Sequence, residues 1–317
     1  MNRREFLRTG LLAGAALQFP HFWIKAARAQ RHVRITLLQT NDTHSRIDPF
    51  PMDGGRYQGL GGIARRSSLV KQIRQQNPLT LLVDAGDVLQ GTPYFNLFKG
   101  TVEYKTMSRC DYFASTLGNH EFDNGVDALF QDLQHAEFDI VNCNFDFGET
   151  PLSKRVKTFT TQTMGPIKIG ITGVGIDFVD LVAPKNHQGV QYINPFKPLQ
   201  RVVNYMRNEL ECSLILVLSH LGYQPHSGKP GDTDLAREVD GIDWIVGGHS
   251  HTFMDKPDVI TSKGGHTTRI LQVGWAGIIL GRTDFIFEEN RLMAAHTHLM
   301  TVDESCPEYV TTEEMLA

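Results

Sequence analysis

Five short apolar segments of this chain each end in residues that can bind a metal ion. The segments are RITLLQT, LTLLVDA, YFASTL, SLILVL and IDWIV, and the residues that follow them are rich in Asp, Asn, His and Gly. Short apolar runs closed by glycine or polar residues are typical of buried strands. In layered α/β folds, ligand sites form at the carboxyl ends of the strands. The pattern therefore predicts an α/β fold with a metal centre along one edge.

Segments typical of helices and strands alternate along the rest of the chain, which favours stacked sheets flanked by helices. A glycine-rich loop over residues 54–62 lacks the Lys-Ser/Thr pair of a P-loop, so we do not expect it to hold a nucleotide in that manner. We expect one catalytic domain over residues 30–303 and an acidic, solvated tail over residues 304–317. The expected helices are 63–76, 102–110, 126–135 and 194–210, and the expected later strands are 155–161, 167–174, 269–273 and 278–287.

The first 29 residues are typical of an export signal. Arg3 and Arg4 precede a short apolar stretch, and Ala27-Arg28-Ala29 resembles a cleavage site. The paired arginines indicate a signal peptide of the twin-arginine type, with an ordinary Sec signal as the alternative. We therefore expect a periplasmic or otherwise exported protein. No apolar run reaches the roughly 20 residues of a membrane span.

The charge balance argues against nucleic acid as a partner. The sequence has 31 Lys and Arg against 35 Asp and Glu. Without residues 1–29, which contain five basic residues and one acidic residue, 26 basic and 34 acidic residues remain, a net charge of −8. An acidic surface of this kind repels a phosphate backbone.

The four cysteines are not expected to bind metal. The sequence contains no CxxC motif, and Cys143 and Cys212 lie in or beside apolar runs. An oxidising compartment permits disulfides, but buried free thiols are the preferred interpretation for Cys110, Cys143, Cys212 and Cys306.

Seven residues at the ends of the apolar segments form the predicted metal centre. In an extended chain, side chains two residues apart point the same way, so each of the pairs Asp42–His44 and His249–His251 can reach one ion. Asp87 can bridge two ions with its two carboxylate oxygens. Mixed Asp, His and Asn ligands suit Zn, Mn, Fe or Co better than an all-oxygen calcium site. The predicted ligands are Asp42, His44, Asp87, Asn119, His220, His249 and His251.

His120 and Asp123 are predicted to have a catalytic role. His120 follows the predicted ligand Asn119, so its ring should project in another direction. Asp123 can hold one ring nitrogen and fix its tautomer and charge. Such an imidazole can stabilise a phosphoryl oxygen or protonate a leaving group. The alternative is a structural His120 with Asp123 as a helix cap. Asp84 is interpreted as a structural carboxylate at the end of a strand.

The motifs NDTHSR, DAGDVLQGTPYFN, STLGNHEFDNG, SHLG and GGHSHT resemble those of the calcineurin-like metallophosphoesterases, and within them the 5'-nucleotidase group. The resemblance implies a four-layer α/β/β/α sandwich and two divalent metal ions. It implies that Asp42, His44, Asp87 and His251 hold one ion and that Asp87, Asn119, His220 and His249 hold the other. It also implies that His120 and Asp123 are the catalytic dyad.

The resemblance further implies hydrolysis of phosphate monoesters, with nucleotides as the first substrates to consider and nucleotide catabolism as the setting. The alternatives are a UDP-sugar or cyclic-nucleotide hydrolase, a thiosulfohydrolase, and a non-catalytic binding protein on the same fold. Full-length relatives carry a second domain that grips the nucleobase, so a separate polypeptide is an expected partner. Residues near the motifs that could contact a substrate, unless they serve only in packing, are Phe50, Tyr57, Tyr94, Arg46 and Arg65.

Overall fold

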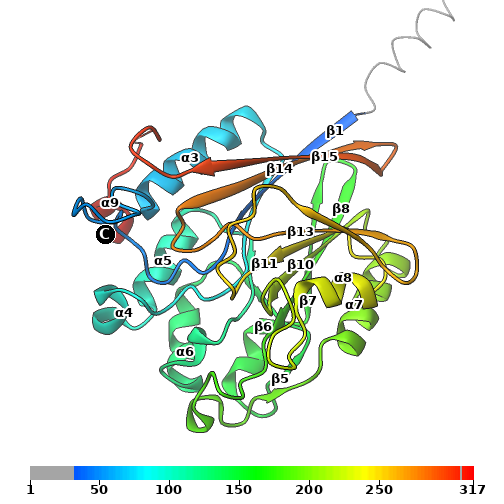
Figure 1. Ribbon diagram of the computed structural model, residues 1–317, viewed down its shortest axis with the longest axis horizontal. Coiled ribbons are helices and arrows are strands. Elements are labelled where there is room, and N and C mark those ends of the chain that lie inside the picture. The colour runs from blue at the N-terminus through cyan, green and yellow to red at the C-terminus, as the bar shows by residue number, and fades with distance from the viewer. Residues whose placement is uncertain (1–31, 308) are drawn as a thin grey trace, which may run out of the picture.

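Two sheets of mixed direction form the centre of the molecule (Figure 1). The computed structural model describes residues 32–307 and 309–317, so the predicted signal segment lies outside the described residues. The first sheet has seven strands, in the order β15 (Arg291–Thr301), β14 (Ile279–Glu288), β1 (His32–Thr40), β2 (Thr80–Asp84), β3 (Ala114–Ser115), β4 (Asp139–Val141) and β6 (Val156–Lys157). The second has six, in the order β12 (Asp258–Thr261), β13 (Thr267–Leu271), β11 (Trp244–Gly247), β10 (Leu214–His220), β8 (Ile167–Gly175) and β7 (Phe159–Met164).

Within each sheet, the strands that carry the motifs run parallel to one another. In the first sheet β1, β2, β3 and β4 run parallel. In the second sheet β8, β10, β11 and β13 run parallel, and β7 and β12 are antiparallel edge strands. Parallel strands end at the same edge, so each sheet delivers the residues after its strands to one side. A separate pair, β5 (Phe145–Asp146) and β9 (Gln191–Tyr192), is antiparallel.

Helices cover the outer face of each sheet, which gives four layers. The seven-stranded sheet is covered by α3 (Ile63–Gln76), α5 (Thr101–Arg109) and α6 (Val126–Asp132), and the six-stranded sheet by α7 (Phe196–Asn208) and α8 (Asp232–Glu238). The described residues also form two short helices, α4 (Pro93–Phe98) and α9 (Thr312–Leu316). Their 3₁₀ turns are η1 (His120–Phe122), η2 (Leu133–His135), η3 (Pro151–Lys154) and η4 (Pro184–His187). The predicted α/β/β/α sandwich is confirmed.

Alternating side chains of the central strands pack into different layers. On β1, Ile35 and Leu37 face the second sheet, whereas Leu38 packs with the helices. Trp244 of β11 is fully buried between the sheets, and its Nε1 donates to Gln39 Oε1 at 3.1 Å. Strands buried on both faces read as continuous apolar runs, which is why the five sequence segments are largely apolar.

The expected elements agree best with the structure where a local helical pattern of apolar residues defines them. The helix expected at 63–76 is α3, whereas the helix expected at 194–210 begins only at Phe196, after Pro195. The single strand expected at 155–161 is wrong, because β6 and β7 belong to different sheets. The sequence analysis did not identify α8, β12 or β15.

The expected solvated tail is wrong in part. Glu304, Glu313 and Glu314 are exposed, but Cys306 and Met315 are buried against the helical layer of the first sheet. The segment ends in α9, which packs on α3 and α5. A sparse apolar pattern of this kind gives little signal, because only one face of a short helix is buried.

All four cysteines are free thiols in the structure, and Cys110, Cys212 and Cys306 are buried. Burial raises the pKa of Cys143 to about 12, so its thiol stays protonated at neutral pH. Among the described residues, no helix is both long and apolar enough to cross a membrane.

Candidate metal centre

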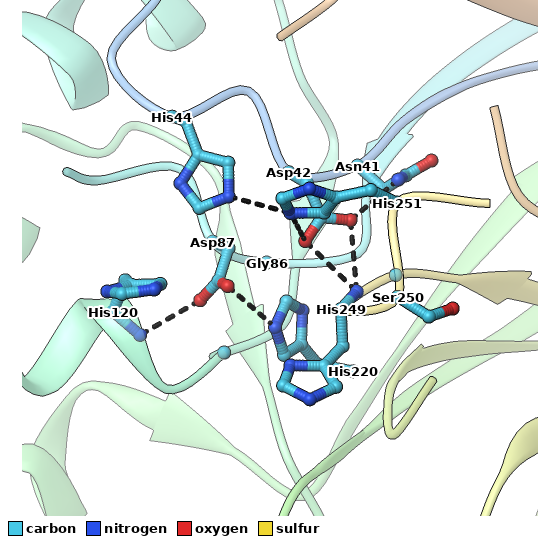
Figure 2. A network of polar contacts seen from close by, with 12 residues as sticks. Asn41, Asp42, His44, Gly86, Asp87, His120, His220, His249, Ser250 and His251 are labelled. Atoms are coloured by element: carbon cyan, nitrogen blue, oxygen red, sulfur yellow. Dashed lines mark hydrogen bonds and ion pairs between the residues drawn. The ribbon is translucent and has the colours of Figure 1, made fainter. Parts of the chain in front are cut away.

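The loops that follow five strands meet at one edge of the two sheets (Figure 2). Strand β1 leads to Asp42 and His44, β2 to Asp87, and β3 to Asn119. Strand β10 ends at His220, and β11 leads to His249 and His251. Two groups of side chains there could hold a metal ion: Asp42 with His44 and His251, and Asp87 with His220 and His249.

In the first group, two imidazole nitrogens face each other. His44 Nε2 lies 3.0 Å from His251 Nε2, and His251 Nε2 lies 3.4 Å from Asp42 Oδ1. His44 Nδ1 lies 3.1 Å from the carbonyl oxygen of Leu89, which places its hydrogen on Nδ1 and its lone pair on Nε2. A carbonyl that fixes the tautomer in this way is typical of metal-binding histidines.

The second group is deeper. His220 is fully buried, with Nδ1 2.7 Å from the carbonyl oxygen of Ala85 and Nε2 3.0 Å from Asp87 Oδ2. Among the described residues, His220 Nε2 has no partner in hydrogen-bond geometry. The predicted ligand Asn119 lies beside this group, with its Oδ1 3.0 Å from His249 Nδ1.

The structure places Asp87 directly in the second group only. Its Oδ1 accepts a hydrogen bond from His120 N at 2.9 Å, and its charge also acts on His44 of the first group. Its predicted bridging of two ions therefore stays a prediction.

Glycine is required where the loops approach one another. A Cβ added at Gly118 would lie 2.2 Å from Asp87 Oδ1 and 2.6 Å from His220 Nε2. At Gly86, where φ is 85°, it would lie 2.7 Å from the nitrogen of Gly118. The glycines of the motifs therefore keep open the space into which the ligand atoms point.

Five of the seven predicted ligands have a left-handed backbone. The φ values are 50° for Asp42, 47° for His44, 54° for Asp87, 72° for His249 and 50° for His251. Non-glycine residues seldom adopt this conformation, and it persists only where the surroundings hold it. Concentrated strain of this kind supports the assignment of a functional site.

Burial keeps two of the histidines neutral. It lowers the pKa of His44, and together with the charge of His220 it lowers the pKa of His249 to about 4. Burial also acts to lower the pKa of His220, but the Asp87 carboxylate outweighs it and raises that pKa. A bound cation would supply the positive charge that Asp87 otherwise draws from a proton, so the donor set fits divalent metal ions.

His120 and Asp123 form a pair beside these groups. His120 Nδ1 lies 2.8 Å from Asp123 Oδ2, because the η1 turn places residues i and i+3 on one side. The His120 ring lies 5.4 Å from the His44 ring. Burial acts to lower the pKa of His120, but the Asp123 hydrogen bond and the Asp87 charge raise it overall. Asp123 does not cap α6, whose N-cap is Gly125.

Glu121 was not assigned a role from the sequence, yet it joins two of the ligand loops. Its buried carboxylate accepts hydrogen bonds from Asp87 N at 3.0 Å and Val88 N at 2.8 Å, and from Gly118 N on the other loop. A glutamate inside the STLGNHEFDNG motif, next to a fully buried Phe122, was the available signal. Asp84 accepts from Thr40 Oγ1 at 2.6 Å and Gly86 N at 2.8 Å and lies in neither ligand group.

Gln272 holds the loop that carries His249 and His251. It is fully buried just after β13, and its Nε2 donates to the carbonyl oxygen of Gly248 at 2.7 Å. Its Oε1 accepts from Thr252 N at 3.1 Å and from Ser250 Oγ at 3.0 Å. The amide thus binds both ends of a turn with two strained residues. No local pattern in the sequence indicates this contact.

Comparison with known proteins agrees with this geometry. The family model for calcineurin-like phosphoesterases matches residues 35–253. The chain is 30% identical to a 5'-nucleotidase of Bos taurus over 94% of its length and 53% of the relative, and 31% identical to a snake venom 5'-nucleotidase of Crotalus adamanteus over 80% and 45%. The chain therefore spans about half the length of the curated relatives it matches. It belongs to the calcineurin-like phosphoesterase family.

Solved structures show the same fold. The crystal structure of a 5'-nucleotidase precursor from Thermus thermophilus has a TM-score of 0.79 and 31% identity, and the match covers 90% of this chain and 58% of that one. A sulfate thiohydrolase from the same organism has a TM-score of 0.75 at 18% identity, covering 89% and 59%. At that identity the second likeness shows the fold alone.

We predict that Gln272→Leu weakens metal binding. The substitution keeps the apolar volume but removes the contacts to Gly248 and Thr252, so the turn loses its support. Loss of residues that orient metal ligands typically lowers metal affinity by roughly 10–100-fold. Competition with a coloured chelator measures this affinity, and Gln134→Leu, at an exposed site on η2, is the control. Unchanged affinity in folded Gln272→Leu protein would contradict the role given to Gln272.

Proposed function

We propose that this chain is a dinuclear metal-dependent hydrolase of phosphate monoesters, with nucleoside 5'-monophosphates as its first substrate class. The observation that carries the proposal is the position of the His120–Asp123 pair next to both candidate metal groups. The His120 ring lies 5.4 Å from the ring of His44 in the first group, and His120 N donates to Asp87 in the second. Membership of the phosphoesterase family and the names of the relatives support it.

We propose the following roles for the residues, and the two groups of candidate ligands support them. Asp42, His44 and His251 would hold one ion, and Asn119, His220 and His249 the other, with Asp87 shared between them. Bound divalent ions supply a water of lowered pKa and neutralise phosphoryl oxygens. His120, oriented through Nδ1 by Asp123, presents Nε2 to the phosphoryl group or to the leaving oxygen. Transfer of a proton from that nitrogen to the leaving oxygen as the P–O bond breaks lets it depart as an alcohol and not as an alkoxide.

Substrate recognition is the less defined part of the proposal. Because the chain spans about half of its curated relatives, we propose that residues other than those described here, in the same or a separate polypeptide, contribute to discrimination among nucleotides. A panel of phosphate esters assayed with added Mn, Zn, Co or Mg tests the activity itself. Failure to hydrolyse any of them under these conditions would overturn the proposed function.

We predict that the metal-replete protein holds two divalent ions per chain and that Asp87→Ala loses both. The reason is that only Asp87 is proposed to contact both ions. Elemental analysis of the folded protein measures the ion count, with Asp146→Ala at an exposed position as the control. Retention of one ion in Asp87→Ala would mean that Asp87 serves the His220 group alone, as its direct contacts in the structure are arranged.

We predict that His120→Ala keeps its ions and loses most of its turnover. The substitution removes the ring but keeps the backbone donor to Asp87, so the ligand groups stay in place. General acid catalysis of this type contributes roughly 10²–10⁴-fold to the rate. His251→Ala should lose metal as well as rate. The division of roles is wrong if both variants lose metal to the same extent.

We also propose export through the twin-arginine route with cleavage near Ala29, which lies outside the described residues. We predict that a double Arg3→Lys, Arg4→Lys variant accumulates as the uncleaved precursor in the cytoplasm, because this route reads the arginine pair. Cell fractionation with an antibody to the chain measures the distribution. Normal export of the double variant would indicate the Sec route.

A further inference from the structure

We propose that Phe50, Tyr57, Phe253 and Trp275 bind the flat aromatic part of the substrate's leaving group, such as a nucleobase or an aryl ring. We name these four residues the aromatic wall. The inference rests on the proposed function, because it places the phosphoryl group of the same substrate at the candidate metal centre.

The aromatic wall begins at the metal centre itself. The indole ring of Trp275 stacks on the ring of His251, with centroids 5.6 Å apart and an interplanar angle of 5°. It also lies 6.4 Å from the ring of His44, and both histidines point into the site in Figure 2. A phosphoryl group held there would therefore place the group attached to it within reach of these rings.

Three loops that are distant in sequence build the wall. Trp275 meets Phe50 edge to face at 5.7 Å and Tyr57 at 6.0 Å. Tyr57 in turn lies nearly parallel to Phe253, with centroids 6.3 Å apart and an angle of 19°. Phe253 is 44% exposed and the other three rings are half-buried, so the wall keeps surface available to a ligand.

The wall is held rigidly to the ligand loops. Asn41 Nδ2 donates to the carbonyl oxygen of Gly274 at 2.6 Å, and Ala276 N donates to the carbonyl oxygen of Asp42 at 2.7 Å. The ring of Phe253 lies over Gly274, where an added Cβ would be 2.2 Å from the ring. The absence of a side chain at Gly274 therefore makes room for Phe253 beside Trp275. A preorganised surface loses less entropy on binding.

The charges around the wall favour an anionic ligand over an apolar one. The Arg46 guanidinium lies 4.0 Å from the centre of the Phe50 ring, and that of Arg56 lies 5.2 Å from the centre of the Tyr57 ring. Among the described residues, Arg46 Nε is buried without a hydrogen-bond partner. Aromatic faces beside guanidinium donors suit a flat ring that carries a phosphate.

Stacking of this kind selects for any flat ring and reads no hydrogen-bond pattern. The wall would therefore favour nucleotides and aryl phosphates alike over aliphatic phosphates. AMP and ribose 5-phosphate are the matched pair, because both release a primary alcohol at the 5-position and only AMP has a base. The preference for AMP over ribose 5-phosphate isolates the contribution of the wall.

The test compares kcat/KM for these two substrates in the metal-loaded full chain. We expect the native protein to prefer AMP. Tyr57→Leu and Phe253→Leu keep apolar volume without a ring, and each should lower the preference for AMP about tenfold, within the range measured for base stacking. Most of the loss should appear in KM for AMP. Tyr205→Leu is the control, because Tyr205 lies on the outer helix α7 and its ring contacts Phe159, which is not part of the wall.

A second measurement separates this inference from the proposed function. Calorimetry with adenosine, which has no phosphate, reports binding to the wall without turnover, and Tyr57→Leu and Phe253→Leu should weaken it about tenfold. If the protein hydrolyses no ester, the calorimetry alone decides. The inference is overturned if adenosine does not bind, or if both variants leave the AMP preference and adenosine affinity unchanged. It is also overturned if the native protein does not prefer AMP. That result is expected if the wall is instead a contact surface for another polypeptide.

Discussion

The face-to-face packing of two sheets sets the geometry of the candidate metal centre, because each ligand group draws side chains from both sheets. The first group combines Asp42 and His44, which follow β1, with His251, which follows β11. The distance between them is therefore set by the apolar layer between the sheets. Gln39 is the polar exception in that layer, and its amide is satisfied by Trp244 Nε1 and by the carbonyl oxygen of Leu271 at 2.9 Å. Satisfied in this way, a buried amide joins the sheets without the cost of unpaired polar atoms.

The same packing buries charge at the strand ends, and the surrounding backbone offsets only part of the cost. Asp42 is fully buried and accepts two contacts of 3.0 Å from His249 N, and the 2% exposed Asp87 accepts one from His120 N. Buried carboxylates without a cation are costly. Left-handed backbone at five of the predicted ligands adds strain. A site of this composition is best stabilised by bound cations, so metal and local structure should depend on each other.

The sequence indicated most of the candidate site because the seven predicted ligands stand at or just after the ends of five apolar strands. Local periodicity also placed α3 with its observed ends. The missing parts depend on contacts between distant residues. Nothing in residues 155–161 shows that the chain passes there from one sheet to the other. Gln272 is one polar residue after a strand, and its role appears only when the loop of Gly248 folds onto it. Likewise, Phe253 and Tyr57 become neighbours only through the tertiary structure.

Trp275 links the two parts of the proposed site, and this link limits how they can be studied. Its ring stacks on His251, a candidate ligand, and also makes T-shaped contacts with Phe50 and Tyr57. A change at Trp275 would therefore alter metal binding and ring binding together, and its effect could not be assigned to either. Tyr57 and Phe253 have no ring contact with the candidate ligands among the described residues, so their substitution separates recognition of the leaving group from the chemistry at phosphorus. If these variants lose kcat/KM only for substrates that carry a ring, that loss can be assigned to the wall alone.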